Sequence, residues 1–217
     1  MSASTLPDRL EAALQALPLV AILRGIEPSE AASLARALYE AGFRLIEVPL
    51  NSPEPFDSIA IMRENLPAAA IVGAGTVTTI GDVERLVSIG ADLVVMPHAD
   101  TAVIAAAKAA GLISLPGIAT PTEAFAALAA GADALKIFPA EMVQPAAVKA
   151  MLSVLPAGTR LFPVGGITPK TMAPFREVGV SGFGLGSALY KPGMGVGEIA
   201  SRAKEFVGTW RGYDTSR

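Results

Sequence analysis

The sequence predicts a single α/β domain over residues 1–217, folded as a (β/α)8 TIM barrel with one extra N-terminal helix. Short apolar runs recur along the chain, and amphipathic segments separate them at intervals of roughly 20–26 residues. The near-continuous apolar character of these runs is typical of parallel strands that helices cover on both faces. The predicted strands are 19–24, 45–50, 70–75, 93–98, 112–117, 134–139, 160–166 and 182–187.

The segments between these runs carry helix signals. In 28–41, apolar residues recur every three or four positions, which gives the segment one apolar face. Thr120 is followed by Pro121 and, three residues after the threonine, by Glu123, which is the pattern of a capped helix start. We expect residues 4–16 to form the extra helix and to close the bottom of the barrel. The rival architecture, an open doubly wound sheet, seldom contains so many consecutive strand-helix units.

Composition excludes several classes of protein. The chain is 52% hydrophobic and 17% charged, yet it has no uninterrupted apolar run long enough to span a membrane. The first residues lack the basic start and apolar stretch of a secretory signal, so we expect a soluble, cytoplasmic protein. The net charge of −3 gives no general attraction to nucleic acid or to an anionic membrane.

The cysteine and histidine content limits the chemistry further. The sequence has no cysteine, which excludes disulfides, thiolate metal sites and a cysteine nucleophile. His98 is the single histidine, so a histidine-rich zinc site is excluded and a Ser-His-Asp triad would have to be centred on it. Carboxylate pairs with ligand spacing are missing from the predicted strand ends, and we therefore expect no metal. We assign His98 no role.

Three ionisable residues fall where a barrel interior is normally apolar. Alternate strand residues point inward, and this phase places Lys136, Glu47 and Arg24 on the inner side of their predicted strands. All three lie toward the carboxyl ends of these strands, which is the face where barrel enzymes carry their active sites. Burial of such groups costs several kcal/mol per ion unless the ions are paired or perform chemistry.

Two interpretations of the buried charges are open. Glu47 and Lys136 can neutralise one another as a buried ion pair with a structural role only. Alternatively, an apolar pocket formed by Ile137 and Phe138 lowers the pKa of the Lys136 amine and makes it a nucleophile toward carbonyl groups. Glu47 would then shuttle protons during imine chemistry.

Glycine-rich turns follow the last two predicted strands. The segments 164–167 and 184–187 each place glycines before a helical segment, so that a ligand could approach bare backbone N–H groups. The loops after strands 7 and 8 are the recurrent phosphate site of the TIM barrel, although tight turning alone could also explain the glycines. The segments 73–76 and 116–120 bring further small residues and hydroxyls to the same rim, where turning and substrate contact are about equally plausible.

Seven sequence motifs are spread along nearly the whole chain. They are A-I-L-R-G-I (21–26), I-E-V-P-L-N-S (46–52), V-G-A-G-T-V (72–77), L-P-G-I-A-T-P-T-E (115–123), A-L-K-I-F-P-A (134–140), P-V-G-G-I (163–167) and G-L-G-S-A-L-Y (184–190). Together these motifs resemble those of the 2-keto-3-deoxy-6-phosphogluconate (KDPG) aldolase family. The resemblance implies a class I aldolase that works without a metal or an organic cofactor and typically assembles as a homotrimer.

The same resemblance implies roles for individual residues. Lys136 would form the Schiff base and Glu47 would be the general acid and base. The implied substrate contacts are Arg24, Thr76 and Pro97 at the pyruvate end and channel, Phe138 beside the lysine, and Gly165, Gly166, Gly186 and Ser187 at the phosphate.

Two positions bear on the substrate's stereochemistry. Family members that act on the gluconate-derived substrate usually have an arginine in place of Asn51 and a threonine in place of Val164, so this chain is more similar to those that act on the C4 epimer. We therefore expect cleavage of 2-dehydro-3-deoxy-6-phospho-D-galactonate to pyruvate and D-glyceraldehyde 3-phosphate. The alternatives are the same reaction on the gluconate epimer or on both epimers, a phosphosugar isomerase with Glu47 as its base, and a non-catalytic phosphate-binding module.

Overall fold

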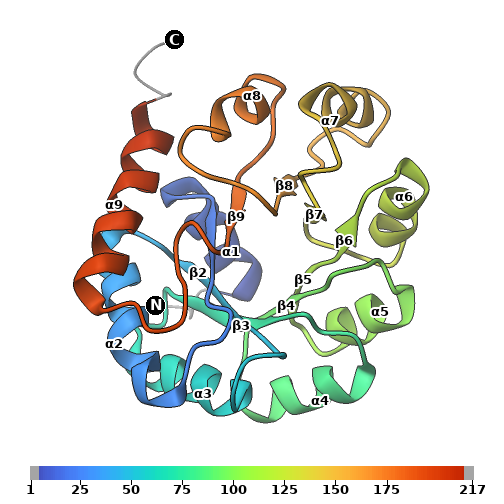
Figure 1. The fold of residues 1–217 in the computed structure, drawn as a ribbon. Coiled ribbons are helices and arrows are strands. Elements are labelled where there is room, and N and C mark those ends of the chain that lie inside the picture. The colour runs from blue at the N-terminus through green and yellow to red at the C-terminus, as the bar shows by residue number, and fades with distance from the viewer. Residues whose placement is uncertain (1–4, 213–217) are drawn as a thin grey trace.

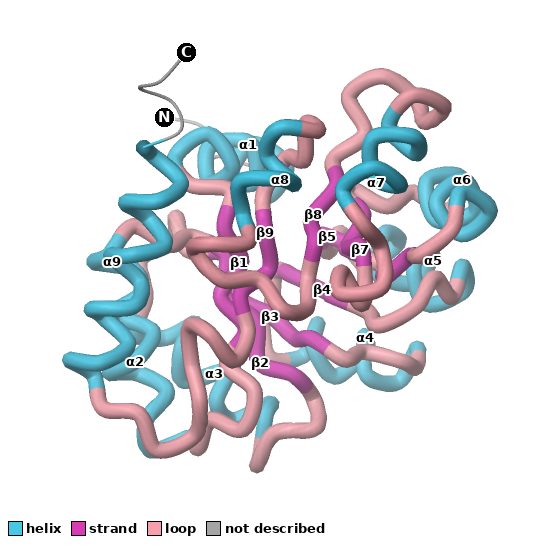
Figure 2. The backbone as a smooth tube through the Cα atoms, turned by 45° about the horizontal axis from the view of Figure 1, so that its top comes forward, coloured by secondary structure: helices cyan, strands magenta, loops and turns pink. Residues whose placement is uncertain are grey.

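The computed structural model describes residues 5–212, in which short strands occupy the middle of the molecule and helices surround them (Figures 1 and 2). The strands lie where the apolar runs predict them, although most are shorter than predicted and the fifth is divided in two. They are β1 (Leu19–Ile22), β2 (Leu45–Pro49), β3 (Ile71–Gly75), β4 (Leu93–Val95), β5 (Ile113–Leu115), β6 (Gly117–Ile118), β7 (Leu135–Ile137), β8 (Leu161–Pro163) and β9 (Phe183–Leu185).

The strands form two parallel sheets, and the prediction of a closed (β/α)8 TIM barrel is therefore wrong. The larger sheet has six strands in the order β5-β4-β3-β2-β1-β9, and the smaller has three in the order β6-β7-β8. Between β8 and β9 a single isolated bridge, Val164 to Gly184, joins the two sheets in the described part of the chain. What the repeating apolar runs did predict correctly is a parallel arrangement with helices outside.

Pro116 marks the division of the fifth predicted strand. The residues before it, in β5, pair with β4, whereas the residues after it, in β6, pair with β7. A proline has no backbone N–H to donate to a neighbouring strand, so the ladder is interrupted at this position. The carbonyl of Pro116 still accepts a hydrogen bond from the Lys136 amide at 2.9 Å, which fixes the start of β7 beside the break.

Helices cover the outside of the strands. The predicted capped start at Thr120 is confirmed, because its side chain and Glu123 form a capping box. None of the described helices is long and apolar enough to cross a membrane. The helices are α1 (Leu6–Ala16), α2 (Pro28–Ala41), α3 (Pro55–Asn65), α4 (Ile80–Ser88), α5 (Thr101–Ala109), α6 (Pro121–Ala129), α7 (Pro145–Leu152), α8 (Met172–Glu177) and α9 (Val196–Gly212).

The additional helix predicted at 4–16 is present as α1 over the described residues. Leu10 and Ala13 of this helix pack in one cluster with inward residues of the strands, such as Leu45 and Ile71. Arg9 fixes α1 to the start of β4 through an ion pair with Asp92, in which Nη1 and Oδ1 lie 2.9 Å apart. One end of the strand assembly is thereby covered.

Two apolar clusters show which way the strand residues point. Leu135 and Ile137 on β7 belong to the cluster between strands and helices, as do Ile46 and Val48 on β2. Residues of the opposite phase, including Leu45 and Ala134, belong to the inner cluster. The predicted alternation is therefore confirmed for the two strands that carry Lys136 and Glu47.

Candidate active site

Lys136 and Glu47 lie together in the interior of the molecule. The exposed fraction is 6% for Lys136 and 2% for Glu47, so both are buried. Both line one narrow cavity, which we call the inner cavity. Its other lining residues are Val20, Ile22, Val95, Leu115, Phe162, Val164 and Gly184. The amine and the carboxylate thus share a small, largely apolar space, as the strand phase predicts.

Burial shifts the pKa values of the two groups toward one another. Desolvation raises the pKa of Glu47 from 4.5 to about 7, although the charges of Lys136 and Arg24 oppose the rise. Desolvation also lowers the pKa of Lys136 from 10.5, and Arg24 lowers it further while Glu47 opposes the change. The Lys136 Nζ lies 4.5 Å from the centroid of the Phe138 ring. Burial therefore favours the uncharged form of both groups, and a pKa of about 7 lets Glu47 exchange its proton readily near neutral pH.

A comparison with Asp92 distinguishes this site from a structural ion pair. Asp92 is also buried, but it accepts hydrogen bonds from Arg9 and the Val72 amide and forms an ion pair with Arg63. By contrast, Oε2 of Glu47 is buried without a hydrogen-bond partner, and no ion pair within the described residues joins Glu47 to Lys136. A buried carboxylate oxygen without a hydrogen bond lowers the stability of the fold, so a purely structural role does not explain it. The same oxygen is free to accept a hydrogen bond from a ligand or a water.

Arg24 lies at the mouth of the site and not in the interior where the strand phase placed it. Strand β1 ends at Ile22, so Arg24 is already part of the following loop and is exposed. Its guanidinium donates a hydrogen bond to Asn51 Oδ1, and the amide of Gly25 donates one to Ser52 Oγ at 2.9 Å. The loops after β1 and β2 are therefore held together, a contact between segments distant in sequence that the motifs alone do not reveal.

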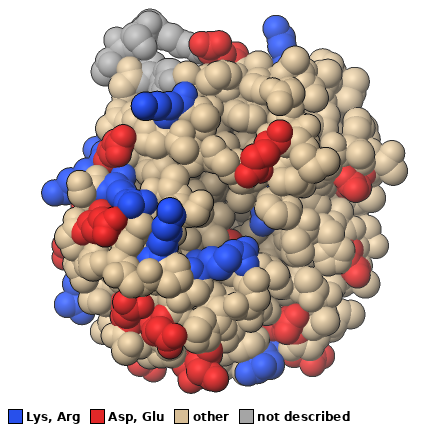
Figure 3. All heavy atoms as spheres, viewed as in Figure 1, with Lys and Arg blue, Asp and Glu red and all other residues tan. Residues whose placement is uncertain are grey.

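A second cavity, the outer cavity, of about 310 Å³ lies beside the first. It brings together all four residues that resemblance assigns to phosphate, Gly165, Gly166, Gly186 and Ser187, and Arg24 also lines it. Ile22 and Val164 line both cavities, so the outer cavity adjoins the inner one. On the face viewed in Figure 3, Lys and Arg side chains lie beside a hollow near the middle of the surface.

Several lining residues of the outer cavity were not predicted, among them three with polar or charged side chains. Tyr190, Lys191 and Glu141 line it together with the predicted set, and Phe138 contributes its exposed ring. Tyr190 lies within a motif that carries the resemblance, which is a signal that sequence reasoning could have used. Glu141 follows the Lys136 strand by only a few residues, but its position depends on how two loops approach one another.

Thr76 and Pro97 are predicted substrate contacts that line neither cavity in the described structure. Thr76 directly follows β3 and has a positive φ of 58°, which a β-branched residue rarely adopts. Backbone strain of this kind is concentrated at functional sites. Pro97 is half-buried, and His98 is exposed. Within residues 5–212, no group of three or more His, Cys, Asp or Glu residues is placed to hold a metal ion.

Known proteins resemble this chain over most of its length. The family model for KDPG and KHG aldolase matches residues 10–199. The probable 2-dehydro-3-deoxy-6-phosphogalactonate aldolase of Rhizobium meliloti (strain 1021) is 45% identical over 207 residues, which cover 95% of this chain and 96% of the relative. The 2-dehydro-3-deoxy-6-phosphogalactonate aldolase of Escherichia coli (strain K12) is 45% identical over 195 residues, or 90% of this chain and 95% of the relative. The solved native KDPGal structure superposes with a TM-score of 0.90 at 44% identity, covering 92% of this chain and 97% of that one.

Proposed function

The chain belongs to the KDPG and KHG aldolase family, and from this premise we propose that it is a class I aldolase that forms a Schiff base on Lys136. Its substrate is 2-dehydro-3-deoxy-6-phospho-D-galactonate, and its products are pyruvate and D-glyceraldehyde 3-phosphate. The single observation that carries the proposal is the buried amine beside an unsatisfied carboxylate, in an apolar space that adjoins a glycine-lined cavity.

The reaction begins at the Lys136 amine. Neutral Nζ attacks the C2 carbonyl of the keto acid, and the resulting carbinolamine loses water to give an iminium ion. Burial lowers the pKa of this amine, which supports the step because an ammonium ion has no lone pair to donate. The positive iminium nitrogen then serves as the sink for the electron pair that the next step releases.

Glu47 moves the protons in the later steps. Its carboxylate, acting through a water, accepts the proton of the C4 hydroxyl while the C3–C4 bond breaks, and the electron pair of that bond moves into the iminium. Carbon 4 leaves as the aldehyde carbon of glyceraldehyde 3-phosphate, and the pyruvate enamine remains on Lys136. Glu47 returns the proton to C3 of the enamine, and a water then hydrolyses the iminium to release pyruvate and the free amine.

The two cavities divide the substrate between them. We place the reacting keto acid in the inner cavity and the phosphate in the outer cavity, against the backbone of Gly165, Gly166 and Gly186 and the hydroxyl of Ser187. Arg24 lies in the lining of the outer cavity, so we place it beside the phosphorylated part of the substrate. Thr76, Pro97 and Phe138 remain proposed contacts of the pyruvate end and the channel.

The choice of the galactonate epimer rests on Val164 and on the names of the relatives. Val164 lines both cavities. We therefore propose that its side chain contacts the substrate between the reacting end and the phosphate end. An apolar side chain there leaves a substrate hydroxyl of the wrong configuration without a partner, which lowers its binding. Two relatives with 45% identity carry the name of the galactonate enzyme.

We also propose a cellular setting for this activity. The enzyme acts in galactonate degradation in the cytoplasm, works without a metal or an organic cofactor, and forms a homotrimer. These proposals rest on the family resemblance. Sedimentation of the purified chain measures the oligomeric state directly, and a monomer or a dimer would contradict the trimer.

An assay of pyruvate release from the two phosphorylated epimers tests the proposed function. We expect the galactonate epimer to give the higher kcat/KM and the Lys136→Met variant to release no pyruvate from either epimer. Lys204→Met is the matched control, because Lys204 is an exposed residue of α9 that lines neither cavity. A higher kcat/KM for the gluconate epimer would overturn the assignment of the epimer, and an active Lys136→Met enzyme would overturn the Schiff base.

A further inference from the structure

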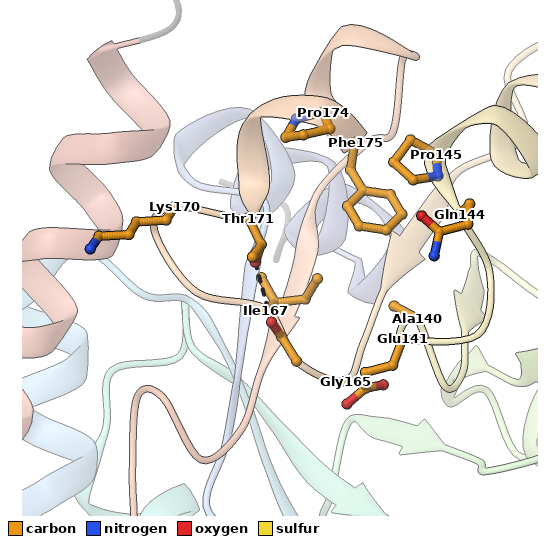
Figure 4. Close-up of a pocket in the computed structure, with 11 residues that line it drawn as sticks. Ala140, Glu141, Gln144, Pro145, Gly165, Ile167, Lys170, Thr171, Pro174 and Phe175 are labelled. Carbon is orange, nitrogen blue, oxygen red and sulfur yellow. Dashed lines mark hydrogen bonds between the residues drawn. The ribbon is translucent and has the colours of Figure 1, made fainter.

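The carboxylate of Glu141 lies against the two glycines that are proposed to bind phosphate. Glu141 belongs to the loop between β7 and α7, whereas Gly165 and Gly166, which we call the diglycine turn, follow β8. A Cβ on Gly165 would overlap Glu141 Oε2 and lie 3.0 Å from its Cδ, and a Cβ on Gly166 would lie 2.9 Å from its Cγ. Figure 4 shows the side chain of Glu141 reaching Gly165.

This contact is not a structural ion pair or a helix cap. Glu141 is exposed, and in the described part of the chain it takes part in no hydrogen bond and no ion pair. The helix that follows it, α7, begins at Pro145 and has Gln144 as its N-cap, so Glu141 lies too early in the sequence to cap it. The carboxylate therefore rests on the diglycine turn without a partner of its own.

Glu141 also separates two spaces. It lines the outer cavity on one side of the diglycine turn and a second, side cavity of about 410 Å³ on the other. The side cavity has room for the carboxylate to move into, between Gln144 and Thr171. Lys170 also lines the side cavity, although its amine points away from Glu141 in Figure 4.

Glu141 is the acidic side chain among the charged residues that line the outer cavity in the described part of the chain. Arg24 and Lys191 are the cations of its described lining, and Glu141 is the carboxylate. A phosphate monoester carries nearly two negative charges at neutral pH, and like charges within a few ångströms repel. A phosphate bound at the diglycine turn would meet Glu141 at close range.

We propose that the Glu141 side chain occupies the diglycine turn in the free enzyme and must leave it when a phosphate monoester binds. The proposal rests on the proposed function, because it assigns the diglycine turn to phosphate. Glu141 weakens the hold on the phosphate group and thereby favours release of the phosphorylated aldehyde product. It does not take part in the chemistry at Lys136.

The variant Glu141→Gln keeps the shape of the side chain and removes its charge. We expect it to bind a phosphate monoester about fivefold more tightly than the wild type, which is the size of effect expected when a repulsion between exposed charges is removed. The KM for the phosphorylated substrate should fall by a similar factor, while kcat does not rise. Because salt screens exposed charges, the difference between the two proteins should shrink at high ionic strength, which a purely structural effect would not do.

The experiment measures the Kd of glycerol 3-phosphate, which carries the phosphate but no keto group, by calorimetry at low and at high ionic strength. Glu177→Gln is the control, because Glu177 is an exposed residue of α8 that lines none of the cavities described here, and its loss changes the net charge equally. Tighter binding by Glu141→Gln alone, reduced by salt, supports the proposal. An unchanged or weaker affinity, or equal tightening in Glu177→Gln, overturns it.

Failure of the proposed function would look different. If the enzyme is not an aldolase, the wild type releases no pyruvate from either epimer, but the comparison of glycerol 3-phosphate affinities still gives a result. If the enzyme is an aldolase and Glu141 has no such role, pyruvate is released and the Kd values of the wild type and Glu141→Gln coincide. Each proposal can therefore fail without the other.

Discussion

Gly75 leaves the space that the carboxylate of Glu47 occupies. The two residues lie on neighbouring strands, β3 and β2, and a Cβ on Gly75 would overlap Oε1, Oε2 and Cδ of Glu47. Glu47 can therefore be buried at this position only because residue 75 has no side chain. The position of the proposed general base depends on a glycine that takes no part in the reaction.

The variant Gly75→Ala should displace the Glu47 carboxylate and lower kcat by about a hundredfold or more, since positioned proton transfer contributes factors of this size. Steady-state kinetics of pyruvate release measures the loss. Borohydride trapping with pyruvate should still label the variant, because Lys136 is untouched. An enzyme with full kcat would contradict the proposed role of Glu47.

Gly81→Ala is the control for the loss of a glycine. In α4, a Cβ on Gly81 would have only Thr79 Oγ1 nearby, at 3.8 Å, and the residue is exposed. Alanine is favoured over glycine inside a helix by about 0.5–1 kcal/mol, so this variant should be at least as stable as the wild type and fully active.

The raised pKa of Glu47 predicts the acidic side of the pH profile. Below a pKa of about 7 the carboxyl group is mainly protonated and cannot accept the C4 hydroxyl proton. We therefore expect kcat/KM to rise roughly tenfold per pH unit below about pH 7 and to level off above it. Because the charges of Glu47 and Lys136 influence one another, the midpoint of the profile belongs to the coupled pair and not to Glu47 alone. A profile already flat between about pH 5 and 7 would show that burial does not raise the pKa of Glu47 as described.

The sequence predicted the inward orientation of Lys136 and Glu47 better than the architecture around them. Alternation along a strand has a period of two, and the apolar neighbours of Lys136 and of Glu47 were enough to place both side chains inward. The division at Pro116 was missed because one proline inside an apolar run does not by itself show which strand each half will pair with. The same limit applies to the contact between Glu141 and Gly165, which depends on how two loops pack.

Arg24 illustrates the remaining error. The prediction assumed that the in-and-out alternation of side chains continues to Arg24, but β1 ends two residues earlier, at Ile22. Beyond the end of a strand this alternation no longer predicts where a side chain points. Its actual partner, Asn51, comes from the loop after β2. Sequence patterns describe single elements well, but the meeting of loops from different elements requires the folded structure.

Asn51 should act as a positioning residue for Arg24. The variant Asn51→Ala removes the acceptor of the guanidinium hydrogen bond. The Arg24 side chain would then lose its conformational freedom only when substrate binds, which weakens binding. We therefore expect KM to rise about fivefold with little change in kcat. Asn51→Gln keeps an amide acceptor oxygen without adding a charge and should restore part of the affinity. Asn65→Ala, at the exposed end of α3, is the control. A fall in kcat with KM unchanged would contradict a positioning role.

Val164 should control the choice between the two epimers. Its backbone is fixed by hydrogen bonds, in which its N–H donates to the Ile137 carbonyl and its carbonyl accepts from the Ala140 amide, both at 2.9 Å. The variant Val164→Thr therefore changes the side chain without moving the strand. We expect the ratio of kcat/KM for the gluconate epimer to that for the galactonate epimer to rise roughly tenfold, because a hydroxyl can now pair with the substrate. An unchanged ratio would place the selector elsewhere.

Trapping of the Schiff base on the intact enzyme tests the central claim most directly. The protein is incubated with pyruvate and sodium borohydride, digested, and analysed by mass spectrometry with peptide sequencing. The buried amine predicts a reduced pyruvate adduct on Lys136, which should be lost in Lys136→Met and retained in Lys204→Met. An adduct on another lysine, or no adduct under conditions in which the enzyme releases pyruvate from its substrate, would contradict the account.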